Sequence, residues 1–123
     1  MLPGLALADN EYYAMNIQNN TPCKLEIMSV DGLNPQLLDQ EKTSVYKIEK
    51  QKIYISTHVG ASADRQEDCP NVNLQYQTSD QKFLNQGNVA VEIDHKILKP
   101  KEQMSGKNFK GNIVIPADKK EVQ

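Results

Sequence analysis

Alternation of apolar and polar residues with a period of two is the dominant pattern along the chain. It recurs in seven segments, in which every second residue is apolar and its neighbours are mostly polar, as in a strand that buries one face. The apolar positions are Tyr13/Met15/Ile17, Leu25/Ile27, Tyr46/Ile48, Ile53/Ile55, Val72/Leu74/Tyr76, Val89/Val91/Ile93 and Ile113/Ile115. We therefore predict about seven β-strands.

Residues that turn the chain lie between these segments. They are Asn19-Asn20-Thr21-Pro22, Asp31-Gly32, Asn34-Pro35, Asp80-Gln81, Gln86-Gly87-Asn88 and Gly111-Asn112. Asn, Asp, Gly and Pro favour turns because they tolerate a positive φ or fix a turn-compatible one. Short strands separated by such turns predict an all-β fold, an antiparallel β-sandwich of immunoglobulin-like or jelly-roll-like type.

Few other elements are predicted. A helix of at most two turns is expected over residues 35–42, because no longer segment keeps a period of 3.6. Loops are expected over residues 31–41, 59–70 and 98–110. The last contains Pro100 and Gly106, has no periodicity of its own, and is predicted to be the longest and most mobile loop. The sequence shows no internal repeat.

The composition agrees with one folded domain. The chain has 123 residues, of which 38% are hydrophobic, and a net charge of −2. No stretch approaches the 18 or so consecutive apolar residues of a transmembrane helix. The near-neutral charge gives no field that would attract nucleic acid in general. A transmembrane segment and general nucleic-acid binding are therefore not expected.

The two ends differ in character from the rest of the chain. Residues 1–8 are apolar and end in Ala6-Leu7-Ala8, which places small residues at −3 and −1 before Asp9, as a signal peptidase requires. We interpret 1–8 as the remnant of a signal peptide, with an ordinary apolar N-terminus as the alternative. Residues 9–116 form the expected sandwich domain, and 117–123 a polar tail. The protein is accordingly expected to be exported, to the periplasm or outside the cell.

The two cysteines, Cys23 and Cys69, predict a disulfide. In an exported chain a pair of cysteines is ordinarily oxidised. A zinc site with His58 and His95 is arithmetically possible, but it lacks the paired ligand spacing of such sites. Two unpaired buried thiols are the other alternative.

Loop 59–70 offers oxygen ligands at alternate positions, Asp64, Gln66 and Asp68. A standard calcium loop starting at Asp64 needs Gly at its sixth position and Glu at its twelfth, where this chain has Cys69 and Gln75. The standard site is therefore excluded, and whether the loop binds calcium in another way stays open. No metal ligand set is assigned.

No catalytic set is apparent in the sequence. The imidazoles are His58 and His95, and neither Ser62 nor Ser105 lies in a nucleophile-elbow motif. None of the glycines forms a phosphate-binding loop, so no nucleotide or other cofactor is expected. We assign no catalytic residues and favour a protein that is not an enzyme.

Two surfaces are candidates for binding. Residues 96–110 hold five lysines against Glu102, a local charge of +4, and through Lys99, Lys101 and Lys107 they could contact a polyanion or an anionic membrane surface. The polar positions of one strand, Asn73, Gln75 and Gln77, are the candidate surface for a protein partner.

These observations predict an exported, non-enzymatic binding domain that recognises a protein partner. One alternative is a small secreted enzyme or effector with a site built around His58, Asp64 and His95. A further alternative is an assembly subunit that pairs with its partner by strand edges.

Overall fold

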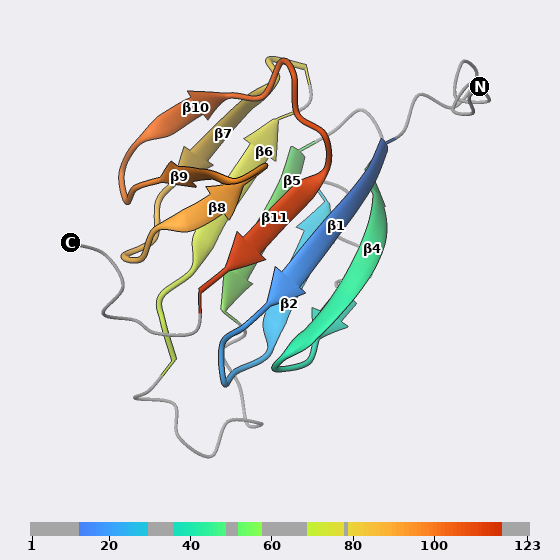
Figure 1. The fold of residues 1–123 in the computed structure, drawn as a ribbon, viewed down its shortest axis with the longest axis vertical. Coiled ribbons are helices and arrows are strands. Elements are labelled where there is room, and N and C mark those ends of the chain that lie inside the picture. The colour runs from blue at the N-terminus through green and yellow to red at the C-terminus, as the bar shows by residue number, and fades with distance from the viewer. Residues whose placement is uncertain (1–12, 30–35, 49–51, 58–68, 78, 117–123) are drawn as a thin grey trace.

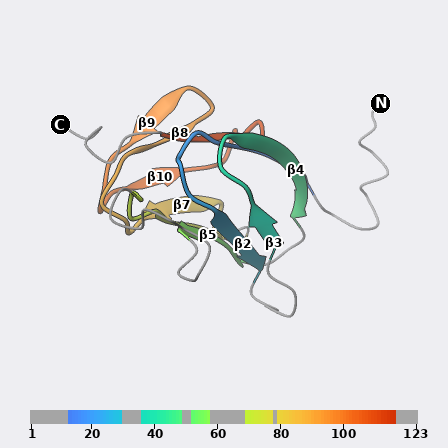
Figure 2. The ribbon, with the colours of Figure 1, turned by 90° about the horizontal axis from the view of Figure 1, so that it is seen from below.

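The computed structural model describes residues 13–29, 36–48, 52–57, 69–77 and 79–116. These residues form eleven strands in two sheets that face each other (Figures 1 and 2). No helix occurs in the described ranges, and the sheets are mostly antiparallel. The predicted all-β sandwich is confirmed, and it has eleven strands where the alternation predicted about seven.

The five-stranded sheet has the order β4-β1-β11-β8-β9. Its strands are β4 (Lys42–Ile48), β1 (Tyr13–Asn19), β11 (Asn112–Ile115), β8 (Val91–Ile93) and β9 (Lys96–Leu98). Strands β1 and β11 run parallel, and every other pair in this sheet is antiparallel.

The six-stranded sheet has the order β10-β7-β6-β5-β2-β3 and is antiparallel throughout. Its strands are β10 (Gln103–Ser105), β7 (Lys82–Asn85), β6 (Asn73–Gln77), β5 (Lys52–Thr57), β2 (Leu25–Ser29) and β3 (Gln36–Leu38).

The core lies between the two sheets and is built from the alternating apolar positions. Those that the structure places in it are Met15, Ile17, Leu25, Ile27, Ile53, Ile55, Val72, Leu74, Tyr76, Val89, Val91, Ile93, Ile113 and Ile115, all at most 6% exposed. Because side chains alternate across a strand, the polar residues between them are turned outward. The period of two therefore identified most of the described core, but it missed Leu38, Phe83 and Leu98, which are at most 4% exposed.

The predicted helix over 35–42 is wrong. Residues 36–38 form β3, and Lys42 begins β4. Leu38 is buried and Leu37 is 47% exposed, which is the alternation of a strand. Glu41 has a φ of 58°, so the chain takes a left-handed turn here and a right-handed helix cannot continue.

The prediction of one long unstructured loop over 98–110 is also wrong. Strand β10 lies inside it and pairs with β7, and Gly106 N donates to Gln81 O over 2.7 Å. Phe109 then contacts the core, with its ring centroid 4.9 Å from Phe83 and 5.6 Å from Tyr76. The sequence pattern missed this because three strand residues contain too few alternations to detect.

Strands β1 to β4 and strands β7 to β10 repeat one arrangement. In each set the first and fourth strands pair in one sheet, while the second and third form a hairpin in the other sheet. The hairpins share their register, since Glu26 lies opposite Leu37 in one and Glu92 opposite Ile97 in the other. The fold thus contains an internal repeat that exchanges the two sheets, which the sequence did not reveal.

Several predictions fall outside the described residues. These are the signal-peptide remnant over 1–8, the tail over 117–123, residues 31–35 and 59–68 of two loops, and with them His58 and the oxygen ligands Asp64, Gln66 and Asp68.

Candidate functional site

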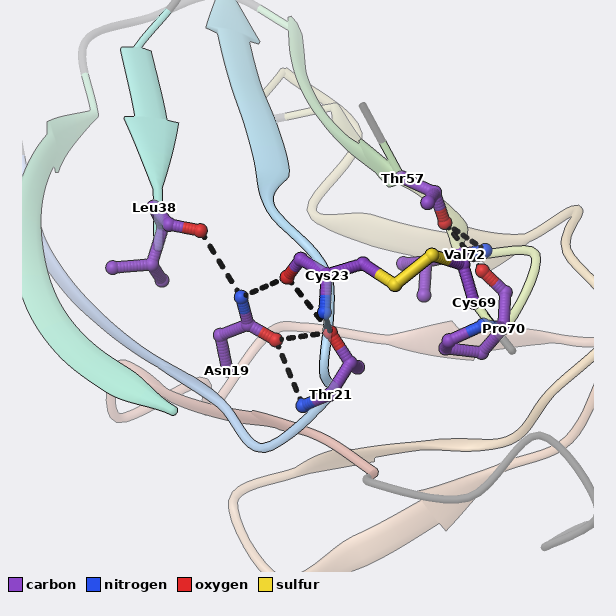
Figure 3. The surroundings of a disulfide bond; sticks show 8 residues. All are labelled: Asn19, Thr21, Cys23, Leu38, Thr57, Cys69, Pro70 and Val72. Carbon is purple, nitrogen blue, oxygen red and sulfur yellow. Dashed lines mark hydrogen bonds between the residues drawn. A yellow bond between two sulfur atoms is a disulfide. The ribbon is translucent and has the colours of Figure 1, made fainter. Parts of the chain in front are cut away.

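The predicted disulfide between Cys23 and Cys69 is present (Figure 3). The two Cα atoms are 5.8 Å apart, inside the range that a disulfide spans. Cys23 lies two residues before the start of β2, and Cys69 lies four residues before the start of β6. Strands β2 and β6 flank β5 in the six-stranded sheet. The bond therefore fixes three neighbouring strands at one end of this sheet, and it excludes the zinc and free-thiol alternatives.

The segment after Cys69 is held to β5 by Thr57. Its Oγ1 donates to Pro70 O over 2.5 Å and accepts from Val72 N over 2.9 Å, while Thr57 N donates to Val72 O over 3.1 Å (Figure 3). The hydroxyl thus continues the ladder between β5 and the residues that lead into β6. The residues that lead into β6 are therefore tied to β5 by these hydrogen bonds and to the start of β2 by the disulfide.

Asn73, Gln75 and Gln77, which the sequence singled out, lie on the outer face of β6, the face turned away from the five-stranded sheet. The alternation establishes this, because Leu74 and Tyr76 between them are buried in the core. Gln75 and Gln77 are half-buried and Asn73 is exposed. They are therefore part of a surface that extends over the neighbouring strands.

The middle of this outer face is a row of residues that lie directly opposite one another on five adjacent strands. From β2 to β10 the row is Met28, Tyr54, Gln75, Leu84 and Gln103. The first four are half-buried although they face away from the core, because each is covered in part by its neighbours. Three of those four side chains are largely apolar, so the centre of the outer face is an apolar strip with one amide in it.

Polar rows flank this central row on both sides. One consists of Glu26, Ser56 and Asn73, with Leu37 of β3 at its end. The other contains Gln77, Lys82 and Ser105. An apolar centre within a polar rim is the usual anatomy of a protein-binding surface.

The outer face offers apolar side chains for contact and amides for hydrogen bonding. The amides of Gln75, Gln77 and Asn73 can each donate and accept. Tyr54 is the one aromatic residue in these rows, so the flat pair of rings that usually holds a sugar is absent from the described part of the face. Sequence reasoning identified the amides but missed Met28 and Leu84, because their place beside Gln75 depends on the register between strands distant in the chain.

Lys99, Lys101 and Lys107 are exposed but do not form one patch. Lys101 N donates to Asn85 O at the end of β7, and its Nζ donates to Gln86 O over 2.7 Å. Lys107 follows Ser105, which pairs with Lys82 at the start of β7. The two lysines thus attach at opposite ends of a four-residue strand, roughly 10 Å apart along the backbone.

Of the residues named for the enzyme alternative, His58 and Asp64 lie outside the described ranges, and the structure describes His95 alone. His95 is exposed in the turn between β8 and β9, where it has a φ of 70°. The neighbouring Asp94 holds the chain after β10, accepting from the backbone N–H groups of Lys110 and of Asn112, the latter over 3.0 Å. Among the described residues no three His, Cys, Asp or Glu side chains gather as metal ligands would.

Comparison with known proteins gives no match from which a function could be taken. No family model matches the chain, and no curated protein or solved structure gives a significant match. The described ranges contain no helix of the length and apolar character needed to cross a membrane.

Proposed function

We propose that this chain is an exported, non-enzymatic binding domain that recognises a protein partner through the outer face of the six-stranded sheet. The observation that carries the proposal is the half-buried central row of Met28, Tyr54, Gln75 and Leu84 between two polar rows. A partner that covers this row removes apolar side chains from water, and the polar rows supply the hydrogen bonds that fix its orientation.

The residue types favour a protein over a sugar or a polyanion as the partner. Met and Tyr are enriched in protein interfaces, where Met adapts its shape and Tyr combines apolar area with a hydroxyl. Sugar recognition would need more flat rings than Tyr54 provides. The lysines are a weaker basis for a polyanion site, because Lys101 Nζ already donates to Gln86 O.

The disulfide supports the exported part of the proposal. Structural disulfides persist in oxidising compartments and are rare where thiols are kept reduced. The Cys23–Cys69 bond also makes the sheet that carries the binding face more rigid, which lowers the entropy lost on binding. The signal-peptide interpretation of residues 1–8 points to the same compartment.

The proposal is tested by photo-cross-linking in producing cells. A photoreactive amino acid replaces Leu84 in the central row, and in a matched variant it replaces Val114, which is equally half-buried but lies on the outer face of the other sheet. We expect a discrete protein adduct from position 84 and none from position 114. Adducts of the same size from both positions, or from position 114 alone, would contradict the proposal.

The residue requirement is then tested on the identified partner. Leu84→Arg and Gln75→Arg place a charge in the central row and should abolish binding, since burying an unpaired charge is costly. Ile97→Arg, at a 57% exposed position of β9, is the matched control and should leave binding unchanged. Circular dichroism of each variant separates loss of binding from loss of fold.

A further inference from the structure

Strand β4 is an edge strand of the five-stranded sheet in the part of the chain that the structure describes. It is seven residues long and pairs with β1 along its whole length. None of its residues from Lys42 to Val45 is buried, and Val45 is 62% exposed. In the described part of the chain no strand lies beyond it, and Figure 2 shows it curving along one side of the sandwich.

The corresponding edge strand in the other half of the internal repeat is shorter. Strand β10 takes the place of β4 there, but it has three residues and ends at Ser105. The chain then turns inward, and Phe109 packs against Phe83 and Tyr76 of the core. One half of the repeat thus has a short edge strand followed by a segment that packs on the core, whereas β4 is four residues longer.

The hydrogen bonds of β1 show which backbone groups of β4 face outward. Asn16 N and Asn20 N donate to β11, to Gly111 O and Ile115 O. Because successive residues of a strand direct these groups to opposite sides, Met15, Ile17 and Asn19 direct theirs to β4. The residues opposite them on β4 are Tyr46, Ser44 and Lys42. These three therefore direct their own N–H and C=O groups to β1.

The remaining residues of β4, Thr43, Val45 and Lys47, therefore direct their N–H and C=O groups to the open edge. Unpaired groups in such a row are a template for a further strand. Val45 is the middle residue of the three. When two copies of this edge lie antiparallel with Val45 opposite Val45, the outward-facing residues of one copy therefore lie opposite those of the other.

We propose that β4 pairs antiparallel with β4 of a second copy of this chain, with Val45 opposite the Val45 of that copy, and that the protein is a symmetric dimer. This register matches Thr43 with Lys47 on both sides, so all three outward-facing residues of each copy find hydrogen-bonding partners. A shift by two residues in either direction leaves one of the three without a partner from this set.

The charges on β4 agree with the same register. Lysines on an edge strand ordinarily discourage pairing, because they would meet like charges on an incoming copy. With Val45 opposite Val45, Lys42 lies opposite Ile48 and Lys47 opposite Thr43, so no two lysines are directly opposed. Two valines in contact across the strands instead contribute the packing that cross-strand apolar pairs provide.

The dimer would also present two binding faces together, a consequence that rests on the proposed function. The two-fold axis between antiparallel strands of one sheet is perpendicular to that sheet. Both six-stranded sheets then lie on the same side, with their outer faces turned the same way. A partner with two matching epitopes would gain avidity from such a pair.

The dimer is tested by sedimentation equilibrium of the purified chain. We expect a mass that rises with concentration to twice the 13.9 kDa of one chain. Val45→Lys and Val45→Asp should each remain monomeric at the highest concentration, because each places like charges opposite each other. An equimolar mixture of the two should recover the dimer, since the introduced charges then attract. The matched control Ile97→Lys, on β9 at the other edge of this sheet, should dimerise like the unmodified chain.

Each other outcome overturns the proposal. A monomer at all concentrations excludes the pairing, and a dimer that survives in both Val45 variants places the interface elsewhere. Loss of the dimer in Ile97→Lys would move it to β9. Circular dichroism confirms that each variant is folded. A second variant, Val45→Pro, removes the N–H of residue 45, which points away from β1, and should therefore also prevent the pairing. Failure of the photo-cross-linking test at position 84 leaves these masses unchanged, so the two proposals fail separately.

Discussion

Asn19 and Asn85 occupy equivalent positions at the ends of β1 and β7 and share three equivalent hydrogen bonds. Asn19 is fully buried, and its Nδ2 donates to Cys23 O four residues later over 2.9 Å and to Leu38 O over 3.0 Å (Figure 3). Its Oδ1 accepts from Thr21 N over 2.9 Å. One amide thus joins the end of β1 to the turn that follows it and to the end of β3.

Asn85 repeats this set in the other half of the fold. Its Nδ2 donates to Val89 O over 2.9 Å and to Leu98 O over 3.0 Å, and its Oδ1 accepts from Gly87 N over 3.0 Å. Leu98 ends β9 as Leu38 ends β3. Each asparagine therefore anchors the crossing from one sheet to the other, which explains why a polar side chain is kept in the core at these two places.

We predict that Asn19→Ala and Asn85→Ala destabilise the protein to a similar extent. Each substitution removes the buried side-chain hydrogen bonds of the asparagine, and a buried carbonyl group left without a donor costs about 1–3 kcal/mol. Urea unfolding measures the change, with Asn112→Ala at an exposed position of β11 as the control. An effect at one asparagine and none at the other would show that the two halves do not depend on the same contact.

A second prediction concerns the disulfide. Replacing both Cys23 and Cys69 by Ala should lower the free energy of unfolding by roughly 4 kcal/mol in the chain-entropy treatment of a loop of 46 residues. The unmodified protein should lose a comparable amount on reduction, and the double variant should not respond to reductant. Alkylation by iodoacetamide before reduction should add no mass, and an added mass would contradict the oxidised state.

A strand was predictable from the sequence where apolar and polar residues alternate over several positions. It was not predictable where the strand has only a few residues. Leu74 and Tyr76 in β6 identify a half-buried strand without further information. Strand β9 has three residues and follows a turn in which Asp94 and His95 both have positive φ, without the glycine that usually marks such hairpins. Edge strands of this length depend on neighbours that lie far away in the sequence.

The internal repeat escaped sequence analysis for a related reason. Glu26 and Glu92 are the same residue at equivalent places, as are Ile27 and Ile93, but most other pairs differ. The central row of the outer face was equally hidden. Leu84 adjoins Gln75 only because β6 and β7 pair in one register, and a shift by one residue would turn Leu84 toward the core.

A third prediction concerns residues 106–109, which follow β10 and pack against the core. A Cβ at Gly106 would lie 2.9 Å from Cε2 of Phe83, whose ring is buried and stacked on Tyr76 at 4.3 Å. Gly106→Ala should therefore destabilise the protein by about 1–3 kcal/mol through overpacking. Lys107→Ala, one residue further along and exposed, is the control.

Hydrogen exchange tests directly whether residues 106–109 are packed in this way. The amide of Gly106 donates to Gln81 O, and the amide of Phe109 donates to Gly106 O, so both should be protected in the native protein. Rapid exchange at these two amides, together with a neutral effect of Gly106→Ala, would show that residues 106–109 do not pack on the core in solution.

The last prediction separates binding from catalysis. Histidine is the side chain whose ordinary pKa best suits general base catalysis near neutral pH, and this chain has only His58 and His95. If either acts as a base, its replacement by Asn should abolish turnover with little change in melting temperature. We expect instead that purified protein shows no activity on ester, glycoside, peptide or phosphate substrates, and that the double variant His58→Asn/His95→Asn keeps the adduct formed from position 84. An activity that purifies with the protein and is lost in that variant would favour an enzyme over a binding domain.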